Sequence, residues 1–336
     1  VRLLEEHGDF EVVGEARDSG TAIRLTEELR PDVITMDMML DDSDGRAATE
    51  QIMAWTPTPI LVVSSSTNRG ELLRTYDALA AGAVDVYDKT MLPSPDAWAK
   101  GFVRAVARVA GIRVISHPRG RLSRDGGRDP IPAPHSNHEQ SVGALVAIGA
   151  STGGPAALVP VLGALPADLG CPVVVVLHIG PTFAHAIAEW FATLTRLPVE
   201  LARHGAALVA GEGRVYVAPP DRHLRVSDGR LLLDDSAPRH SCRPAVDVLF
   251  ESVAIEYGPR CVAALLSGMG RDGALGLLRI REQGGRTLAQ SEETSVVWGM
   301  PGEAVKLGAA QHVLSPAEIG AALVAAVRRP SRGGAS

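Results

Sequence analysis

A chain of 336 residues, 46% of them hydrophobic, is long enough to form two domains of ordinary size. The formal net charge of -6 and the lack of basic clusters interleaved with aromatic residues argue against a nucleic-acid-binding surface. The three cysteines have no metal-ligand spacing, the start is acidic and no apolar run reaches membrane-spanning length, so we expect a cytoplasmic protein without structural metal, disulfide framework or membrane insertion.

The first region of the chain, residues 1–112, alternates short Val- and Ile-rich runs with longer amphipathic stretches. This alternation is typical of βα units around a parallel sheet. Strands are therefore expected at Phe10–Val13, Val33–Met36, Ile60–Val63 and Val84–Tyr87.

Residues 113–142 differ in composition from the region before them. They are rich in Pro, Gly, Ser, Arg and His and have no apolar period, so they cannot bury a core and are predicted to be a linker. A second α/β pattern occupies residues 143–330, with strands expected at Ala144–Ile148, Val173–Leu177, Val215–Ala218, Leu231–Asp234 and Val262–Leu266. Within it, the turn signal Ser227-Asp228-Gly229 predicts an antiparallel hairpin on an otherwise parallel sheet.

Reactive side chains follow three of the strands expected in the second region. Ser151 lies in the GxSxG sequence that ends the first of them, where small neighbours permit a sharp strand-to-helix turn. His178 directly follows the next strand, and Asp272 lies in the glycine-rich segment after the last one. Because the carboxyl ends of parallel strands meet at one edge of a sheet, we expect the three side chains to converge there.

A hydroxyl, an imidazole and a carboxylate are what acyl transfer requires. A serine is a poor nucleophile until an imidazole takes its proton, and a carboxylate fixes the tautomer of that imidazole. We therefore expect Ser151 to attack, His178 to relay the proton, Asp272 to orient His178, and the Met269 N–H to bind the oxyanion. The chain order Ser, His, Asp differs from that of the α/β-hydrolases, so that fold is not assigned.

Each of these residues also has an ordinary structural interpretation. Ser151 and Asp272 could cap helices, and His178 could be a hydrogen-bonded core residue. A second hypothesis makes Gly149–Gly154 a dinucleotide-binding loop, although the next strand is not followed by an acidic residue for the ribose. A third hypothesis is an adaptor protein whose esterase site is no longer active. The remaining histidines are expected on the surface, among them His185, His204 and His223.

The second region resembles the CheB-type chemotaxis protein-glutamate methylesterases in the segments IGASTGGP, VVLHIGPTFA, YVAPPDRHL, RPAVDVLFESVA, LLSGMGRDGALGL and AQSEETSVVWGMPGEAV. The resemblance implies that Ser151, His178 and Asp272 are the catalytic triad, that the Met269 backbone serves the oxyanion, and that Thr152 lies beside the nucleophile. It also implies hydrolysis of γ-glutamyl methyl esters on chemoreceptors, the substrate partners, and in many members deamidation of receptor glutamines. No cofactor is implied for catalysis.

The first region resembles a response-regulator receiver, which implies a flavodoxin-like fold phosphorylated by the histidine kinase of the chemotaxis system. Asp37 matches the phospho-accepting aspartate, Ser64 the switch hydroxyl and Lys89 the phosphate-pairing lysine. A carboxylate accepts the phosphoryl group, while hydroxyl and ammonium groups bind its oxygens. Phosphorylation of the receiver is therefore expected to control the esterase domain.

The first strand of a receiver is missing from this sequence, because the opening VRLLEEHGDFEVVGEA reads as the latter part of the first helix. In receivers that strand is central in the sheet, so Phe10–Val13 and Val33–Met36 lack a pairing partner. The strand also carries the acidic pair that holds Mg²⁺. We therefore expect the natural protein to have an upstream segment, and Mg²⁺ to support phosphorylation of Asp37 only if that segment supplies the pair.

Overall fold

The computed structural model describes residues 1–40, 45–65, 69–90, 94–112, 114, 143–184 and 186–328. The chain divides into two compact units, Val1–Pro130 and Ile131–Ser336, and each is considered by itself. Apart from residue 114, the predicted linker 113–142 lies outside the described residues, as does His185. In the described part of the chain, no helix combines the length and the apolar character that crossing a membrane requires.

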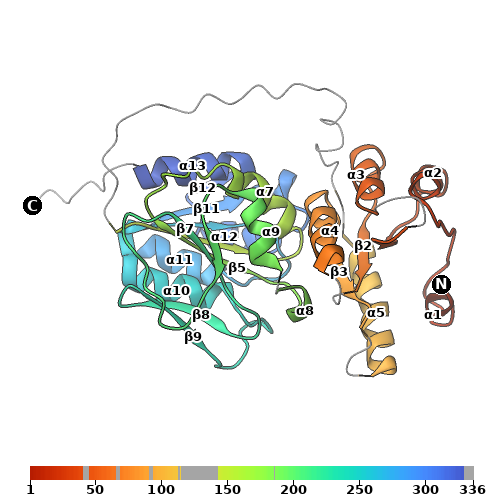
Figure 1. Ribbon diagram of the computed structural model, residues 1–336, viewed down its shortest axis with the longest axis horizontal. Helices are drawn as coiled ribbons and strands as arrows, with labels where there is room; N and C mark the ends of the chain where they lie inside the picture. The colour runs from red at the N-terminus through yellow and green to blue at the C-terminus, as the bar shows by residue number, and fades with distance from the viewer. Residues whose placement is uncertain are drawn as a thin grey trace, which may run out of the picture. The chain divides into compact units, whose positions relative to one another are not determined.

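The N-terminal unit is built around a parallel three-stranded sheet of order β1-β2-β3 (Figure 1). Its strands are β1 (Ile34–Asp37), β2 (Ile60–Ser64) and β3 (Asp85–Asp88). Helices alternate with these strands: α1 (Arg2–Glu5), α2 (Ser19–Leu29), α3 (Gly45–Trp55), α4 (Arg69–Ala80) and α5 (Pro95–Ala110). The alternation of strand and helix that the sequence predicts from residue 33 onward is confirmed, with strand ends shifted slightly.

The strand expected at Phe10–Val13 is wrong, because these residues have no strand pairing in the structure. Among the described residues, β1 pairs with β2 on one side and has no neighbour on the other. An extended segment without a neighbouring strand has no ladder to satisfy its backbone N–H and C=O groups. The β-rich composition of the segment was therefore not sufficient to make it a strand.

The C-terminal unit contains a seven-stranded sheet of order β12-β11-β10-β4-β5-β7-β6, in which every pair is parallel. Its strands are β4 (Leu145–Ala150), β5 (Pro172–Leu177), β6 (Val199–Leu201), β7 (Arg214–Val217), β10 (Cys261–Leu265), β11 (Arg286–Gln290) and β12 (His312–Leu314). The central strands β4, β5 and β10 are buried along their whole length. Their continuous apolar runs are the pattern expected of strands covered on both faces.

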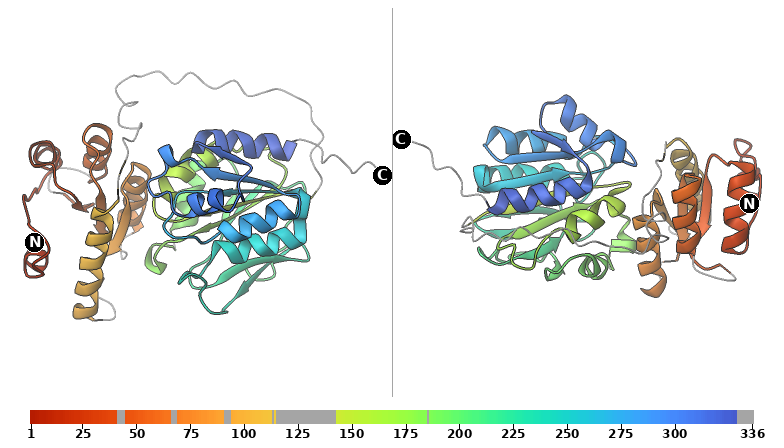
Figure 2. Two further views of the ribbon diagram at one scale, coloured as in Figure 1. Left: turned by 180° about the vertical axis from the view of Figure 1, so that it is seen from behind. Right: turned by 90° about the horizontal axis from the view of Figure 1, so that it is seen from above.

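Helices cover both faces of this sheet, as Figures 1 and 2 show. One face carries α7 (Gly154–Gly163), α9 (Ile187–Leu194) and α13 (Pro316–Arg328), and the other carries α10 (Val246–Tyr257), α11 (Ala274–Glu282) and α12 (Met300–Lys306), while the short α8 (Pro181–Ala184) follows β5. The unit is thus the doubly wound α/β fold that the sequence predicts. The triad candidates all follow β4, β5 and β10, which are neighbours in the middle of the sheet.

The predicted hairpin exists, but it is not part of the main sheet. β8 (His223–Ser227) and β9 (Arg230–Asp234) form a separate antiparallel two-stranded sheet, joined at Asp228 and Gly229 with φ of 50° and 65°. Positive φ at both positions is the geometry of a two-residue hairpin turn. The hairpin cannot extend the sheet at β7 because β5 and β6 already occupy both edges of that strand, so its apolar side chains pack on α10.

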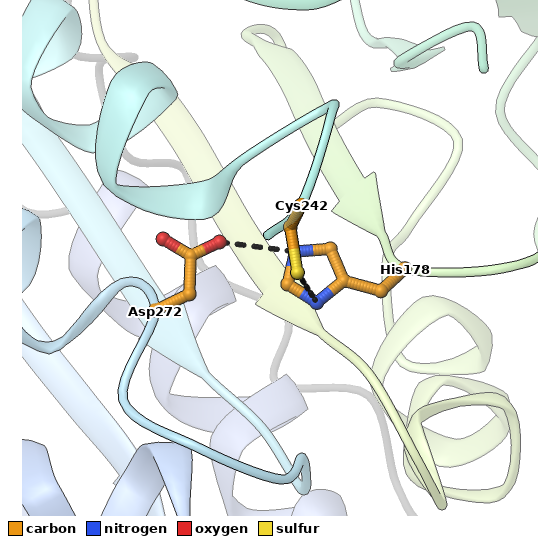
Figure 3. A group of neighbouring side chains, drawn as sticks. All are labelled: His178, Cys242 and Asp272. Atoms are coloured by element: carbon orange, nitrogen blue, oxygen red, sulfur yellow. Dashed lines mark hydrogen bonds and ion pairs between the residues drawn. The ribbon is translucent and has the colours of Figure 1, made fainter. Parts of the chain in front are cut away.

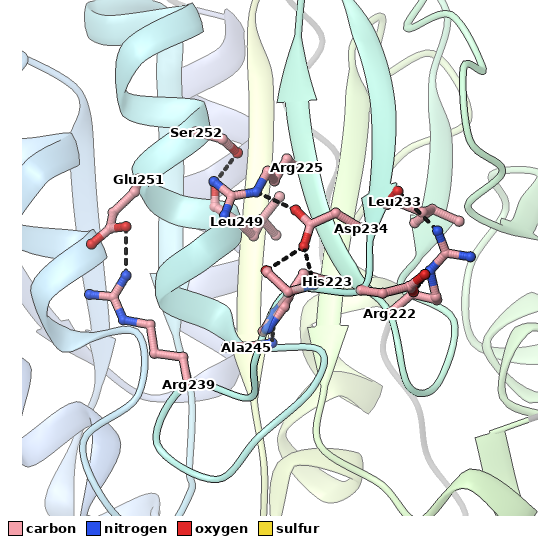
Figure 4. Close-up of polar contacts among 12 residues, drawn as sticks. Arg222, His223, Arg225, Leu233, Asp234, Arg239, Ala245, Leu249, Glu251 and Ser252 are labelled. Carbon is pink, nitrogen blue, oxygen red and sulfur yellow. Dashed lines mark hydrogen bonds and ion pairs between the residues drawn. The ribbon is translucent and has the colours of Figure 1, made fainter.

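His223 at the start of the hairpin is fully buried, which corrects its expected place on the surface. Figure 4 shows it beside Ala245. Its Nδ1 accepts the N–H of Ala245 at 3.2 Å, and its Nε2 donates to the carbonyl of Ala237 at 3.1 Å. Burial of the ring is possible because both nitrogens are satisfied. His204, in contrast, is exposed as expected.

Candidate active site

Ser151 lies on a sharp turn between β4 and α7. Its N–H donates to the carbonyl of Ser267 at 3.0 Å, which ties the turn to the segment that follows β10. Gly153, just before α7, has φ of 74°, and a Cβ there would lie 2.4 Å from that of Val296. Only glycine fits this position without displacing its neighbour, so the small residues after Ser151 have a direct steric reason.

His178 follows β5 and lies beside the Ser151 turn, because its N–H donates to the carbonyl of Ala150 at 3.0 Å. Its side chain is 14% exposed. Nε2 lies 3.0 Å from Oδ2 of Asp272 (Figure 3). This is an ion-pair distance at which the ring N–H does not point straight at the oxygen.

Asp272 is 2% exposed and firmly held. Its Oδ2 accepts the N–H of Val246 at 2.7 Å and its Oδ1 the N–H of Asp247 at 3.0 Å, both at the start of α10. Burial opposes the carboxylate, but the contacts with His178 and these two N–H groups outweigh it and lower the pKa of Asp272. The charge of the aspartate is therefore paired with His178 in a nearly water-free position.

The imidazole of His178 presents its second nitrogen, Nδ1, away from Asp272 (Figure 3). Burial favours the neutral ring, but the contacts with Asp272 and Cys242 and their charges outweigh it and raise the pKa of His178 to about 9. Among the described residues, no hydrogen bond joins the Ser151 hydroxyl to His178. Nucleophile and base are often separated in this way in a protein without substrate.

Cys242 is a neighbour of His178 that the sequence interpretation missed. Its Sγ lies 3.6 Å from Nδ1 of His178. The cysteine ends a tight turn in which Arg239 and Cys242 exchange backbone hydrogen bonds of 3.0 and 2.8 Å, while His240 and Ser241 have φ of 51° and 64°. Two successive non-glycine residues in the left-handed region are unusual, and no spacing in the sequence reveals them.

A second buried carboxylate, Asp247, was also missed. Its Oδ1 accepts the N–H of Gly276 at 2.7 Å, and its Oδ2 lies 3.0 Å from Nε2 of His240. Burial and the neighbouring Asp272 raise the pKa of Asp247, against the effect of the Gly276 N–H. Arg239 connects this group to α10 through Glu251, at 2.6 Å (Figure 4).

The segment after β10 brings its backbone against Ser151. A Cβ at Gly268 would lie 2.8 Å from that of Ser151 and 2.2 Å from Sδ of Met300. Met269 follows, 44% exposed, and within the described ranges its N–H has no hydrogen-bond partner. Thr152, beside the serine, accepts the Ser267 hydroxyl on its carbonyl at 2.8 Å. Among the described residues, an unpaired backbone N–H thus lies one residue along the chain from the close approach of Gly268 to Ser151.

The N-terminal unit places two of its three predicted site residues together. Nζ of Lys89 lies 2.6 Å from Oδ2 of Asp37 at the end of β1. The buried Ser64 hydroxyl instead donates to Oε1 of Glu71 at 3.1 Å and accepts from Thr75 at 2.8 Å, both on α4. Over the residues that the structure describes, no group of three metal-ligating side chains includes Asp37. These residues therefore do not by themselves fit a Mg²⁺ site.

Comparison with known proteins gives matches over both units. The family model described as CheB methylesterase matches residues 146–323, and that of the response regulator receiver domain matches residues 1–94. The chain is 44% identical over 323 residues to protein-glutamate methylesterase/protein-glutamine glutaminase 2 of Anaeromyxobacter dehalogenans, covering 96% of this chain and 91% of that protein. It is 40% identical to protein-glutamate methylesterase/protein-glutamine glutaminase 3 of Hahella chejuensis, covering 96% and 93%.

A solved structure supports the same comparison for the C-terminal unit. The crystal structure of the Thermotoga maritima CheB methylesterase catalytic domain aligns with a TM-score of 0.52 and 36% identity. The alignment covers 55% of this chain and 98% of that one. The similarity therefore includes almost the whole of that catalytic domain.

Proposed function

The chain belongs to the CheB methylesterase family, and from this membership we propose that it hydrolyses γ-glutamyl methyl esters on chemoreceptors with release of methanol. Its relatives are also named glutaminases, so deamidation of receptor glutamines belongs to the same proposal. One observation carries the assignment of this activity to the edge of the sheet. His178 and Asp272 lie 3.0 Å apart, and the main chain of His178 is hydrogen-bonded to that of Ala150, next to Ser151.

In the proposed mechanism Ser151 attacks the ester carbonyl. Because Nε2 of His178 faces Asp272, its Nδ1 takes the serine proton and then gives it to the departing methanol. Asp272 holds the ring in that tautomer and stabilises its positive charge. A water molecule, deprotonated by the same nitrogen, then releases the glutamate from the acyl-enzyme.

The tetrahedral intermediate needs a donor for its oxyanion, and we assign this role to the N–H of Met269. Met269 follows Gly268, whose backbone comes so close to Ser151 that a Cβ on it would lie 2.8 Å from Cβ of the serine, and this supports the assignment. A single donor of this kind typically lowers the barrier by about 3 kcal/mol. Thr152 lies beside the nucleophile and is proposed to shape the same pocket.

We further propose that phosphorylation of the receiver by a chemotaxis histidine kinase controls this activity. Asp37 is the proposed phospho-acceptor and Lys89, 2.6 Å away, the group that binds the phosphoryl oxygens. Ser64 would give up its hydrogen bonds with Glu71 and Thr75 to reach the phosphoryl group.

We also propose that the protein acts in the cytoplasm. The three free cysteines, Cys171, Cys242 and Cys261, fit the reducing cytoplasm in which chemoreceptor signalling domains are exposed.

The test is methanol release from methylated receptor fragments, measured with the full chain with and without a phosphodonor. We expect Ser151→Ala and His178→Ala to abolish release while far-ultraviolet circular dichroism stays unchanged. His204→Ala, at an exposed histidine, is the matched control and should retain activity. A fluorophosphonate probe should label the wild type and not Ser151→Ala. Near-normal turnover in either active-site variant would refute the proposed mechanism.

A further inference from the structure

His178 has a contact that the proposed mechanism does not use. The thiol of Cys242 lies at Nδ1, the ring nitrogen that remains after Asp272 has engaged Nε2 (Figure 3). We propose that Cys242 and His178, supported by Asp272, bind a soft divalent cation of the zinc class, and that this cation inhibits the enzyme. The inhibitory consequence rests on the proposed function, whereas the binding site itself does not.

The separation of the two candidate ligand atoms fits a tetrahedral ion. A Zn–S bond of about 2.3 Å and a Zn–N bond of about 2.0 Å at a tetrahedral angle place sulfur and nitrogen about 3.5 Å apart. Sγ of Cys242 and Nδ1 of His178 are separated by 3.6 Å. One ligand atom from each of His178, Cys242 and Asp272 lies within 4.8 Å of the others. An ion could therefore bind between sulfur and nitrogen without a large movement of either side chain.

Asp272 supplies the support that a metal-binding histidine usually has. A histidine that binds a metal through one nitrogen nearly always donates its other N–H to a carboxylate or carbonyl, which fixes the ring. Nε2 of His178 lies 3.0 Å from Oδ2 of Asp272, and two backbone N–H groups hold that carboxylate in place. The negative charges of the Cys242 thiolate and of Asp272 together balance the two positive charges of the ion.

The backbone holds Cys242 in place before any ion arrives. The paired hydrogen bonds of 3.0 and 2.8 Å between Arg239 and Cys242 close the turn, and Arg239 is itself held by Glu251 at 2.6 Å. Left-handed φ at His240 and Ser241 costs conformational energy that the surrounding contacts must offset. The thiol is only half-buried, so an ion from solution can reach it.

A neighbouring cluster, His240 with Asp247 and Asp272, is a weaker candidate. These residues also offer ligand atoms within 4.8 Å of one another. However, Oδ2 of Asp247 already faces His240 at 3.0 Å and Nε of Arg239 at 3.7 Å. A guanidinium so close to the carboxylate repels a second cation. The Cys242 thiol is also a softer ligand than imidazole or carboxylate, so a zinc-class ion should prefer the cluster that contains it.

The decisive experiment uses Co²⁺ as a spectroscopic substitute and Zn²⁺ as the inhibitor, both with the full chain. We expect Co²⁺ to produce a thiolate-to-cobalt charge-transfer band in the wild type that is absent in Cys242→Ser. We expect Zn²⁺ to suppress methanol release, a chelator to restore it, and Cys242→Ser to need at least tenfold more Zn²⁺ for half-inhibition, relative to its own uninhibited rate. His240→Gln should keep both the band and the inhibition.

Ser151→Ala separates the metal site from the esterase. This variant should lack activity and retain the cobalt band, because the hydroxyl is not one of the proposed ligands. If the wild type releases no methanol but shows a band that depends on Cys242, the proposed function fails and the metal site stands. A band or a zinc sensitivity that persists unchanged in both Cys242→Ser and Cys242→Ala would overturn the site, as would the lack of any band in the wild type.

Discussion

Raising the pH from about 7 to about 9 should increase kcat/KM for ester hydrolysis about 50-fold, because the base His178 must lose a proton before it can accept one from Ser151. Burial favours the neutral ring, but the contacts with Asp272 and Cys242 raise the pKa of His178 to about 9. A group with this pKa is about 1% deprotonated two pH units below it and half deprotonated at it. kcat/KM should therefore rise about tenfold per pH unit up to the pKa and then level off.

The assay is methanol release from methylated receptor fragments at substrate concentrations far below KM. Ser151→Ala, measured in parallel, gives the rate of uncatalysed ester hydrolysis at high pH, which must be subtracted. Cys242→Ala removes contacts that raise the pKa of His178, so its profile should shift to lower pH and its kcat/KM near neutral pH should increase. A wild-type profile that is already level near neutral pH, with a midpoint at the ordinary histidine value of 6.5, would contradict this reasoning.

Three further predictions concern the same site. Asp272→Asn should lower kcat by roughly 10³- to 10⁴-fold, because the amide favours the wrong tautomer of His178. It should also lower the free energy of unfolding, measured by urea titration, by about 1–3 kcal/mol, because an amide oxygen can accept only one of the two backbone N–H groups that the carboxylate binds. Gly268→Ala should reduce methanol release and cost about 1–3 kcal/mol of stability through contacts with Ser151 and Met300, whereas Gly163→Ala, whose nearest contact would be 3.5 Å, should do neither. Because its folded pKa lies above its ordinary value of 6.5, His178 should stabilise the fold fully below that value and lose its contribution as the pH rises through about 9, and His178→Ala should remove this part of the pH dependence in urea titrations.

In the C-terminal sheet the central strands β4, β5 and β10 were predictable from sequence, whereas β6, β11 and β12 were not. β4, β5 and β10 are buried at every position, so their composition is apolar throughout and marks them clearly. Arg286–Gln290 and His312–Leu314 are mixed or short, and pairing with neighbours makes them strands. The hairpin β8–β9 was also predictable only in part. Its turn was predicted from the residues of the turn itself, but its location outside the main sheet depended on which strand edges were free for pairing.

The candidate site divides in a similar way. Ser151, His178 and Asp272 follow strongly marked strands, so the parallel-sheet rule was enough to place them at one edge. Cys242 was dismissed because it has no partner at a metal-ligand spacing, yet a turn with two non-glycine residues in the left-handed region brings it to His178. Asp247 was hidden on α10, where an acidic residue in the first turn is ordinary. Contacts made by unusual turns and by buried charges are decided by tertiary packing.

Nδ1 of His178 is the atom on which the proposed catalysis and the proposed metal site both depend. Asp272 is fixed by two backbone N–H groups and engages Nε2, so the ring has one nitrogen left for chemistry. The serine proton, the thiol of Cys242 and any bound cation must all use that nitrogen, and only one of them can do so at a time. Removal of the thiol should therefore change both the pH profile of kcat/KM and the sensitivity of methanol release to zinc. The thiolate-to-cobalt charge-transfer band reports metal binding alone, so it distinguishes that effect from the change in proton affinity. A variant that altered one without the other would show that the thiol and the proton do not share Nδ1.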